Sequence, residues 1–382
     1  MRRRPSFSTP VHKPSQPPDL GLFLIVLGLV TFGWVMVYST SAMAAESAYG
    51  NQYYFLKKQI FASIFGFICL LTTLNVPFQK WQRPAWLLFG SGLVMLALVL
   101  VVGRQVGGAK RWLKIGPFGF QPSEPTKIFM ILALADFLDK HQSRLRSFWE
   151  GFVPACLIFL IPAALTFREP DLGTCLLLSG TGFAMILLAG ARWEHCVGVV
   201  GFGIAGIVAA IFKASYRMQR VLAFIDPWKD PHKSGYQLIQ SLLALGSGGI
   251  FGKGLGNSQL KLHYLPDAHT DFIFSILGEE LGLIGTTLLV ILFAALAVRG
   301  FRMARHAPNL FGILTATGIV FLTCFQAFIH LAVSVGLVPT KGIPLPFLSF
   351  GGSSLVVMLA SFGILLNISR YEESPPLKRR SA

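Results

Sequence analysis

Long apolar runs, each near the roughly 20 residues that a helix needs to cross a bilayer, recur along almost the whole chain. Hydrophobic residues make up 53% of the 382 residues, and the mean hydropathy is +0.61, which is more apolar surface than one soluble core can bury. The sequence therefore predicts an all-α polytopic membrane protein with about ten transmembrane helices. These helices are expected to begin near Leu20, Tyr53, Ala85, Glu124, Phe152, Leu172, His195, Phe272, Asn309 and Ser353.

The positions of Lys and Arg predict how the chain is threaded. These residues are retained in cytoplasmic loops, and here they flank the first and last predicted helices and crowd four short connections. An even number of helices then leaves both termini in the cytoplasm. We expect flexible basic tails at 1–18 and 371–382 and a membrane domain at 19–370. A large extracytoplasmic loop at 213–270, between the seventh and eighth helices, and an irregular loop at 336–354 face outward.

Several cations fall in the loops that are predicted to face outward, where the topology rule does not require them. They are Arg104, Lys110, Arg111 and Lys114 in the third loop, and Arg217, Arg220, Lys229, Lys233, Lys253 and Lys261 in the seventh. One interpretation is that long loops cross a membrane regardless of charge. The other is a diphosphate-binding surface, because Arg and Lys stabilise the charge that grows on a phosphoryl leaving group. The net charge of +16 does not indicate nucleic acid, since the chain has no soluble basic domain.

The segment LPDAHTDFIFSILGEELG carries three carboxylates on one hydrophobic stretch. Asp271 stands at the start of an apolar helix, and Glu279 and Glu280 follow about two turns deeper. An ionised group at membrane depth costs several kcal/mol unless a wet cavity or a partner receives it. Asp271 is therefore either a functional group or a helix cap. Glu279 and Glu280 lie about 100° apart on a helix, so at least one should pair with a buried Lys, Arg or backbone group.

Two further acidic patterns allow a structural and a functional interpretation. Glu124 and Lys127 are three residues apart on a helix, which permits a local ion pair. If they line a cavity, Lys127 could hold a diphosphate and Glu124 could orient it or help to bind a metal ion. Asp226 and Asp230 in DPWKD could supply oxygen ligands to a divalent cation, although Asp-Pro is also an ordinary turn starter.

Glycine and proline mark two irregular segments. GSGGIFGKGLG, at 246–256, lacks the strand and helix of a nucleotide-binding loop, so it predicts flexible or tightly turned backbone and not a nucleotide site. Between Gly336 and Ser354, Pro339, Pro344 and Pro346 exclude a continuous helix. Irregular backbone at membrane depth survives where it is buried in protein or lines water, so this loop is expected to wall a cavity that faces outward.

Four long motifs, in this order, resemble the SEDS family of shape, elongation, division and sporulation proteins. They are AKRWLKIGPFGFQPSEPTK, YRMQRVLAFIDPWKDPHKSGYQLIQSLLALGSGG, YLPDAHTDFIFSILGEELG and GIPLPFLSFGGSS. The resemblance covers nearly the whole chain, from the first predicted helix to Arg370. AHTDFIF, IPLPFLSFGGSS and MVYSTSA look more like the division branch, FtsW, than the elongation branch, RodA.

The resemblance implies a peptidoglycan glycosyltransferase that polymerises lipid II into β-1,4 glycan strands and releases undecaprenyl diphosphate. The family's catalytic aspartate corresponds to Asp271, which would act as general base in a single displacement with inversion. Stabilising the departing diphosphate then matters more than a general acid, and Arg, Lys or a divalent cation, Mg²⁺ or Mn²⁺, could do so. The expected substrate-binding residues are Glu124, Lys127, Lys110, Arg111, Arg217, Arg220, Lys261, His269, Ser349 and Ser353.

The same resemblance implies the surroundings in which the chain acts. Its expected partners are lipid II, the nascent glycan strand, a class B penicillin-binding protein and other divisome membrane proteins, without nucleic acid or nucleotide. Its expected place is the cytoplasmic membrane at the division septum. The alternatives are a lipid II flippase, an elongation-type polymerase and a scaffold that recruits a transpeptidase. A flippase should need matching gates on both membrane faces, whereas the unusual cations and Asp271 gather on the outer one.

Overall fold

Helices account for most of the structure, and most of them lie where the apolar runs predict them. The computed structural model describes residues 16–106, 109–115, 118–213, 215–233, 235–260 and 269–371. Ten helices coincide with the predicted ones: α1 (Leu20–Tyr49), α2 (Tyr54–Asn75), α3 (Ala85–Val102), α4 (Ser123–His141), α5 (Val153–Arg168), α6 (Leu172–Leu188), α7 (Trp193–Phe212), α10 (Ile273–Arg305), α11 (Leu310–Ser334) and α12 (Gly352–Ser369). Each begins within two residues of its predicted start, because a chain in lipid must satisfy its backbone internally.

Within the described residues, length and hydropathy alone identify seven of these helices as able to cross a membrane. They are α1, α2, α3, α10, α11, α12 and the stretch Phe148–Arg168 that includes α5. Helix α6 is apolar but has 17 residues. Helix α4 has 19 residues but includes Glu124, Lys127 and Asp136, which lower its hydropathy. The chain is therefore a multi-pass, all-α membrane protein.

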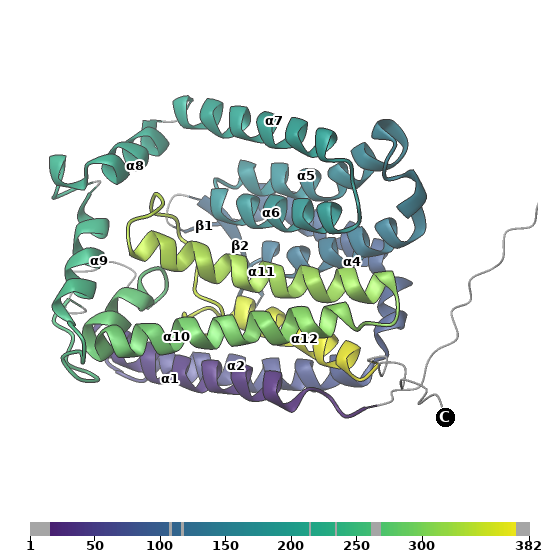
Figure 1. The fold of residues 1–382 in the computed structure, drawn as a ribbon. Coiled ribbons are helices and arrows are strands. Elements are labelled where there is room, and N and C mark those ends of the chain that lie inside the picture. The colour runs from purple at the N-terminus through teal and green to yellow at the C-terminus, as the bar shows by residue number, and fades with distance from the viewer. Residues whose placement is uncertain are drawn as a thin grey trace, which may run out of the picture.

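The membrane helices lie side by side, with α11 in the middle of the bundle (Figure 1). Helix α11 contacts α4, α6, α10 and α12, and most of its side chains are buried. Helices α2 and α12 approach so closely that Gly363 leaves no space for a Cβ atom next to Thr73. Helix α7 runs apart from α5 and α6 along the top of Figure 1, and large side chains such as Phe202 are exposed on it.

The two ends of the described chain meet at one end of the bundle. The backbone N–H of Gln16 donates to the carbonyl of Arg370 at 3.2 Å. Nearby, Arg299 donates to the Asp19 carboxylate at 2.9 Å, and Ser369 accepts from the Asp19 N–H at 3.1 Å. This agrees with an even number of crossings. The predicted basic tails lie almost wholly outside the described residues.

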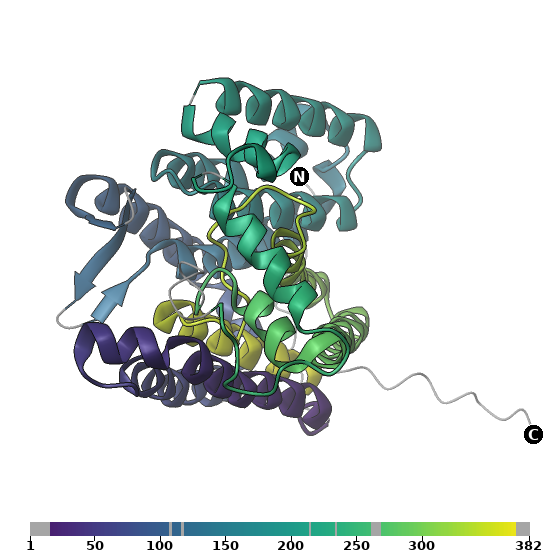
Figure 2. The same ribbon diagram turned by 90° about the vertical axis from the view of Figure 1, so that its left-hand side faces the viewer.

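The opposite end of the bundle carries the long loops (Figures 1 and 2). The third loop forms a small antiparallel sheet with the order β1 (Arg104–Val106), β2 (Ala109–Ile115) and β3 (Phe118–Phe120). The purely helical prediction missed this sheet. The seventh loop contains α8 (Ser215–Ile225) and α9 (Tyr236–Ser247). The short helical turns are η1 (Phe78–Gln82), η2 (Gln142–Arg144), η3 (Phe148–Phe152) and η4 (Pro227–Lys229).

Two predicted irregular segments are irregular in the structure. Residues 336–351 form turns and extended backbone before α12 begins. The glycine-rich segment turns tightly, with positive φ angles at Gly249, Gly252, Gly254 and Gly256, as its composition predicts. Helix α10 is also interrupted, because Gly282 adopts φ 64° and ψ −160° inside it.

Candidate active site

Asp271 lies in the turn that leads into α10, and its side chain is partly exposed. Phe272, and not Asp271, occupies the N-cap position of α10. A Cβ atom placed on Gly342 would lie 3.0 Å from Asp271 Oδ2 and 3.6 Å from Cγ. The carboxylate therefore rests against the backbone of the irregular loop, at the outer end of the bundle, and is neither sealed in the core nor fully exposed.

The two residues before Asp271 are fastened to the same loop. Ser349 Oγ donates to the carbonyl of Thr270 at 2.6 Å, and the Phe350 N–H donates to the carbonyl of His269 at 3.0 Å. The His269 ring packs against Phe55 and Phe350, with centroid distances of 4.7 and 5.8 Å. His269 and Ser349, both predicted as site residues, thus hold the turn that presents Asp271.

Two cations lie next to the loop residue that faces Asp271. Arg220 Nη1 on α8 donates to the carbonyl of Thr340 at 3.2 Å. Lys341 follows, and burial, reinforced by the charge of Arg220, lowers the pKa of its ammonium group although Cys175 has the opposite effect. Arg220 was predicted as a binding residue, whereas Lys341 was missed. The signal was available, since Lys341 is the single charged residue between Gly336 and Ser354.

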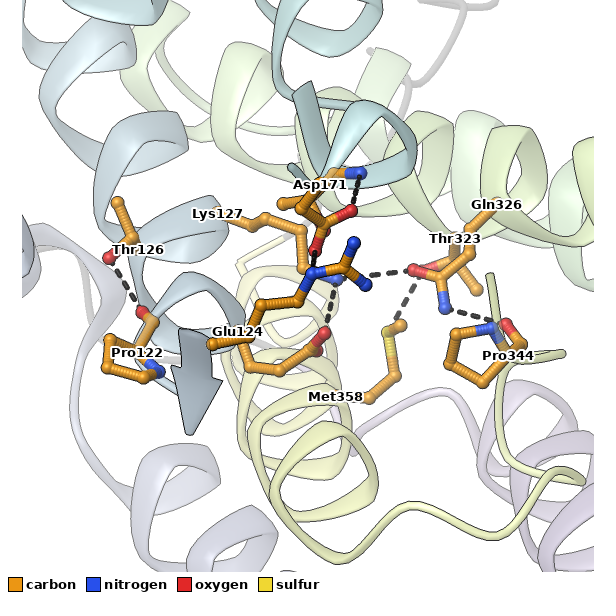
Figure 3. Close-up of polar contacts among 11 residues, drawn as sticks. Pro122, Glu124, Thr126, Lys127, Asp171, Thr323, Gln326, Pro344 and Met358 are labelled. Carbon is orange, nitrogen blue, oxygen red and sulfur yellow. Dashed lines mark hydrogen bonds and ion pairs between the residues drawn. The ribbon is translucent and has the colours of Figure 1, made fainter. Parts of the chain in front are cut away.

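Glu124 and Lys127 form the local ion pair that was one of the two interpretations of their spacing. Lys127 Nζ lies 3.0 Å from Glu124 Oε1, and the two residues are 2% and 4% exposed. Lys127 also donates to Gln326 Oε1 at 3.4 Å, and Gln326 Nε2 donates to the carbonyl of Pro344 at 2.8 Å (Figure 3). Through Gln326, the pair therefore supports the irregular loop at Pro344, two residues after Gly342.

Arg111 attaches the small sheet to the connection between α5 and α6. Its Nε donates to the carbonyl of Glu169 at 3.2 Å, and its Nη2 donates to the carbonyl of Pro170 at 2.5 Å. Its Nε also lies 3.9 Å from Asp171 Oδ2. In α6, Gly173 leaves no space for a Cβ atom beside Ile343. Arg111, a predicted binding residue, thus joins the small sheet to the connection between α5 and α6, and α6 in turn packs against the irregular loop.

The connection between α5 and α6 also buries an acid, Glu169, that no sequence motif predicts. Glu169 is 1% exposed, and within the described part of the chain neither of its carboxylate oxygens has a hydrogen-bond partner. Burial raises the pKa of Glu169 from 4.5 to about 8; the charge of Asp171 raises it further and that of Arg111 opposes the change. The folded protein consequently keeps this carboxyl protonated at neutral pH.

The buried acid predicts a pH-dependent stability. Between about pH 4.5 and 8 the folded state holds a proton on Glu169 that the unfolded state has lost, so stability should fall as pH rises through this window. Glu169→Gln, which stays neutral, should flatten the fall and raise the thermal midpoint at pH 8 but not at pH 4.5. Thermal unfolding of the detergent-solubilised protein, followed by tryptophan fluorescence at several pH values, measures this. Parallel profiles for the two proteins would contradict it.

The remaining predicted residues are dispersed. Ser353 Oγ donates to the carbonyl of Gly119 at 3.0 Å, and Lys110 is exposed on β2. Arg217 belongs to α8, whose described side chains do not include it, and Lys261 lies outside the described residues. Asp226 accepts from the N–H of Trp228 at 3.2 Å, as in an ordinary turn.

Metal binding stays a prediction. Within the described ranges no three His, Cys, Asp or Glu side chains gather as metal ligands do. The pairing predicted for Glu279 and Glu280 is confirmed. Glu279 pairs with Lys253 at 2.8 Å, and Glu280 accepts from Ser39 at 2.6 Å, on different sides of α10.

Comparison with known proteins agrees with the fold and the motifs. The family model for FtsW, RodA and SpoVE, described as a cell cycle protein, matches residues 20–374. Stage V sporulation protein E of Bacillus subtilis (strain 168) is 45% identical over 356 residues, which cover 93% of this chain and 97% of that protein. A probable peptidoglycan glycosyltransferase FtsW of Geobacter sp. (strain M18) is 42% identical over 353 residues, covering 92% and 96%.

Solved structures give the same result. A chain from a study of the structural coordination of polymerization and crosslinking by a peptidoglycan synthase complex superposes with a TM-score of 0.77 at 30% identity, covering 93% of this chain and 99% of that one. The rod shape determining protein RodA of Thermus thermophilus superposes with a TM-score of 0.70 at 29% identity, covering 94% and 98%. The chain therefore belongs to the FtsW, RodA and SpoVE family of cell cycle proteins, the SEDS family.

Proposed function

We propose that the chain is a peptidoglycan glycosyltransferase that polymerises lipid II during septal wall synthesis, with Asp271 as its general base. One observation carries this proposal: the Asp271 carboxylate lies partly exposed against Gly342, in the same loop segment as Lys341 and as Thr340, whose carbonyl accepts from Arg220. The assignment is supported by relatives named probable peptidoglycan glycosyltransferase FtsW, which are at least 40% identical to this chain.

The chemistry needs one carboxylate. Asp271 takes the proton of the acceptor sugar's 4-hydroxyl as that oxygen attacks the anomeric carbon of the donor. The bond from that carbon to the diphosphate breaks, and undecaprenyl diphosphate departs with the electron pair. Because the donor is α-linked and the product β-linked, a single displacement accounts for the inversion. Asp271 then releases the proton to water.

The outer cations suit the departing diphosphate. Within the described residues neither Lys341 nor Arg220 has a carboxylate partner, so their charge is available to an anion. Positive charge in a partly desolvated site stabilises a growing anion more strongly than it would in water. A divalent cation could add to this charge, and comparing rates with Mg²⁺, with Mn²⁺ and with a chelator tests whether one is required.

The cellular setting forms part of the proposal. Lys and Arg near the helix ends favour cytoplasmic termini. A solved relative from a peptidoglycan synthase complex supports a partner that cross-links the new strand, and we propose a class B penicillin-binding protein. Other divisome membrane proteins would place the pair at the septum.

The test is the purified chain with its penicillin-binding partner, given fluorescent lipid II in detergent. Glycan strands of increasing length together with free undecaprenyl diphosphate are the expected products. A parallel assay in liposomes follows the movement of lipid II across the bilayer. Transbilayer movement without any polymer would replace the proposal by the flippase alternative.

Gly342 provides a steric test of the same site. In Gly342→Ala the new methyl group would lie 3.0 Å from Asp271 Oδ2, so the carboxylate must shift. We expect a polymerisation rate about tenfold lower, because small misplacements of a reacting group cost up to about a hundredfold, with an unchanged thermal midpoint. Gly90→Ala, in α3, is the matched control, since nothing lies within 4 Å of the position that its new methyl group would take. Equal rates for the two variants would argue against Asp271 acting at this place.

A further inference from the structure

The first part of α10 is a short, rigid segment that carries Asp271 just before its start. Every residue from Ile273 to Glu280 is buried, and the helix breaks two residues later at Gly282. Ser39 on α1 donates to both carboxylate oxygens of Glu280, at 2.6 and 2.7 Å. This helical segment, Ile273–Leu281, is called the half-helix below. It is anchored to α1 on one side.

The glycine-rich segment occupies the break. The N–H groups of Lys253 and Gly254 donate to the carbonyls of Glu279 and Glu280, both at 2.9 Å. Beyond the break, the Leu283 N–H donates to the carbonyl of Gly249 at 2.9 Å. Helix ends leave such backbone groups without partners inside the helix, so the glycine-rich segment completes the hydrogen bonding of the interrupted helix.

The Glu279 side chain fastens the following residues to the half-helix. It is fully buried, and Lys253 Nζ lies 2.8 Å from its Oε1. Ser258 Oγ donates to Oε2, and the N–H groups of Gln259 and Leu260 donate to the same carboxylate at 3.1 and 3.4 Å. One carboxylate thus accepts from four residues between Lys253 and Leu260.

The described chain ends at Leu260 on this side and resumes at His269, two residues before Asp271. We propose that Glu279 is a positioning residue: with Lys253 it clamps residues 253–260 onto the half-helix, and so keeps Asp271 in register with Gly342 for proton transfer. This inference rests on the proposed function. It predicts that loosening the clamp slows the chemical step and leaves the binding of lipid II intact.

Lys253→Met tests the clamp, because it removes the cation and retains most of the side-chain volume. We expect kcat for polymerisation to fall at least tenfold and KM for lipid II to stay within twofold, whereas Lys253→Arg should keep kcat within threefold. Lys140→Met is the matched control, since Lys140 likewise pairs, at 2.7 Å, with a fully buried carboxylate, that of Asp136, at the far end of α4. The control should lose thermal stability without losing kcat. A normal kcat in Lys253→Met, or parallel losses in both variants, would overturn the proposal.

A covalent replacement separates positioning from stability. The 2.9 Å bond from the Lys253 N–H to the Glu279 carbonyl brings the two backbones within the range of a disulfide. In the double variant Lys253→Cys with Glu279→Cys, oxidation should raise kcat at least fivefold over the reduced protein, while wild type treated alike should not change. A fully oxidised variant no faster than its own reduced form would overturn the clamp alone. A wild type that makes no glycan would overturn the proposed function, and this inference with it.

Discussion

Replacing Asp271 by asparagine is expected to lower the rate of glycan polymerisation by about a thousandfold, because a positioned general base contributes roughly 10²- to 10⁴-fold to a rate. Asparagine keeps the size of the side chain and its packing against Gly342 but cannot accept the proton of the acceptor hydroxyl. Lipid II should still bind, since Lys341 and Arg220 are unchanged. Fluorescent lipid II polymerisation and a separate lipid-binding measurement, both with the purified protein and its partner, check this.

The control for this substitution is Glu194→Gln, which neutralises an exposed carboxylate on α7. Its rate should equal that of wild type. Asp271→Glu should retain part of the activity, since it keeps the base but moves it by one methylene. A near-normal rate in Asp271→Asn would remove the base role and leave the carboxylate of Asp271 as a group that holds the turn from His269 to Asp271.

The fold could be predicted from the sequence wherever lipid dictates it. Each apolar run had to become a helix, because an unpaired backbone group in hydrocarbon costs several kcal/mol, and the starts of α1, α3 and α6 were predicted to the residue. The sheet of the third loop was missed, because its three strands are short and lie outside the membrane, where local pattern is a weak guide. The break at Gly282 was also missed: a single glycine in a helical pattern is usually tolerated.

The sequence predicted single residues of the site better than the contacts that bring them together. Asp271 was identified by motif, and the pairing of a deep glutamate with a cation was expected from the cost of burial. The identity of that cation, Lys253, depends on a tight turn of the glycine-rich segment that no helical spacing describes. Lys341 is the single charged residue of its loop, but its link to Asp271 was not predictable, because the neighbouring Gly342 meets Asp271 from some 70 residues away in the chain, a contact that only the folded backbone creates.

The buried pair of Glu124 and Lys127 predicts the largest loss of stability. In Lys127→Met the Glu124 carboxylate would remain in a place where the residue is 4% exposed, without its cation. Removing one partner of a buried ion pair typically costs about 3–5 kcal/mol, since it leaves an uncompensated charge. We expect a correspondingly lower thermal midpoint in detergent. The exposed pair of Arg299 and Asp19 offers the control: Arg299→Met should cost no more than about 1 kcal/mol.

Removing both charges separates the role of the pair in stability from its role at the site. The double variant Glu124→Gln with Lys127→Met buries no charge, so most of the lost stability should return. Its polymerisation rate should not return, because Gln326 loses the Lys127 donor that holds it while it donates to Pro344 in the irregular loop. A double variant that is both stable and fully active would show that the pair only fills the bundle. A double variant that stays unstable would show that Gln326 and its neighbours cannot repack around two neutral side chains. In that case the hydrogen bonds through Gln326, and not the charge of the pair alone, would hold the irregular loop next to Asp271.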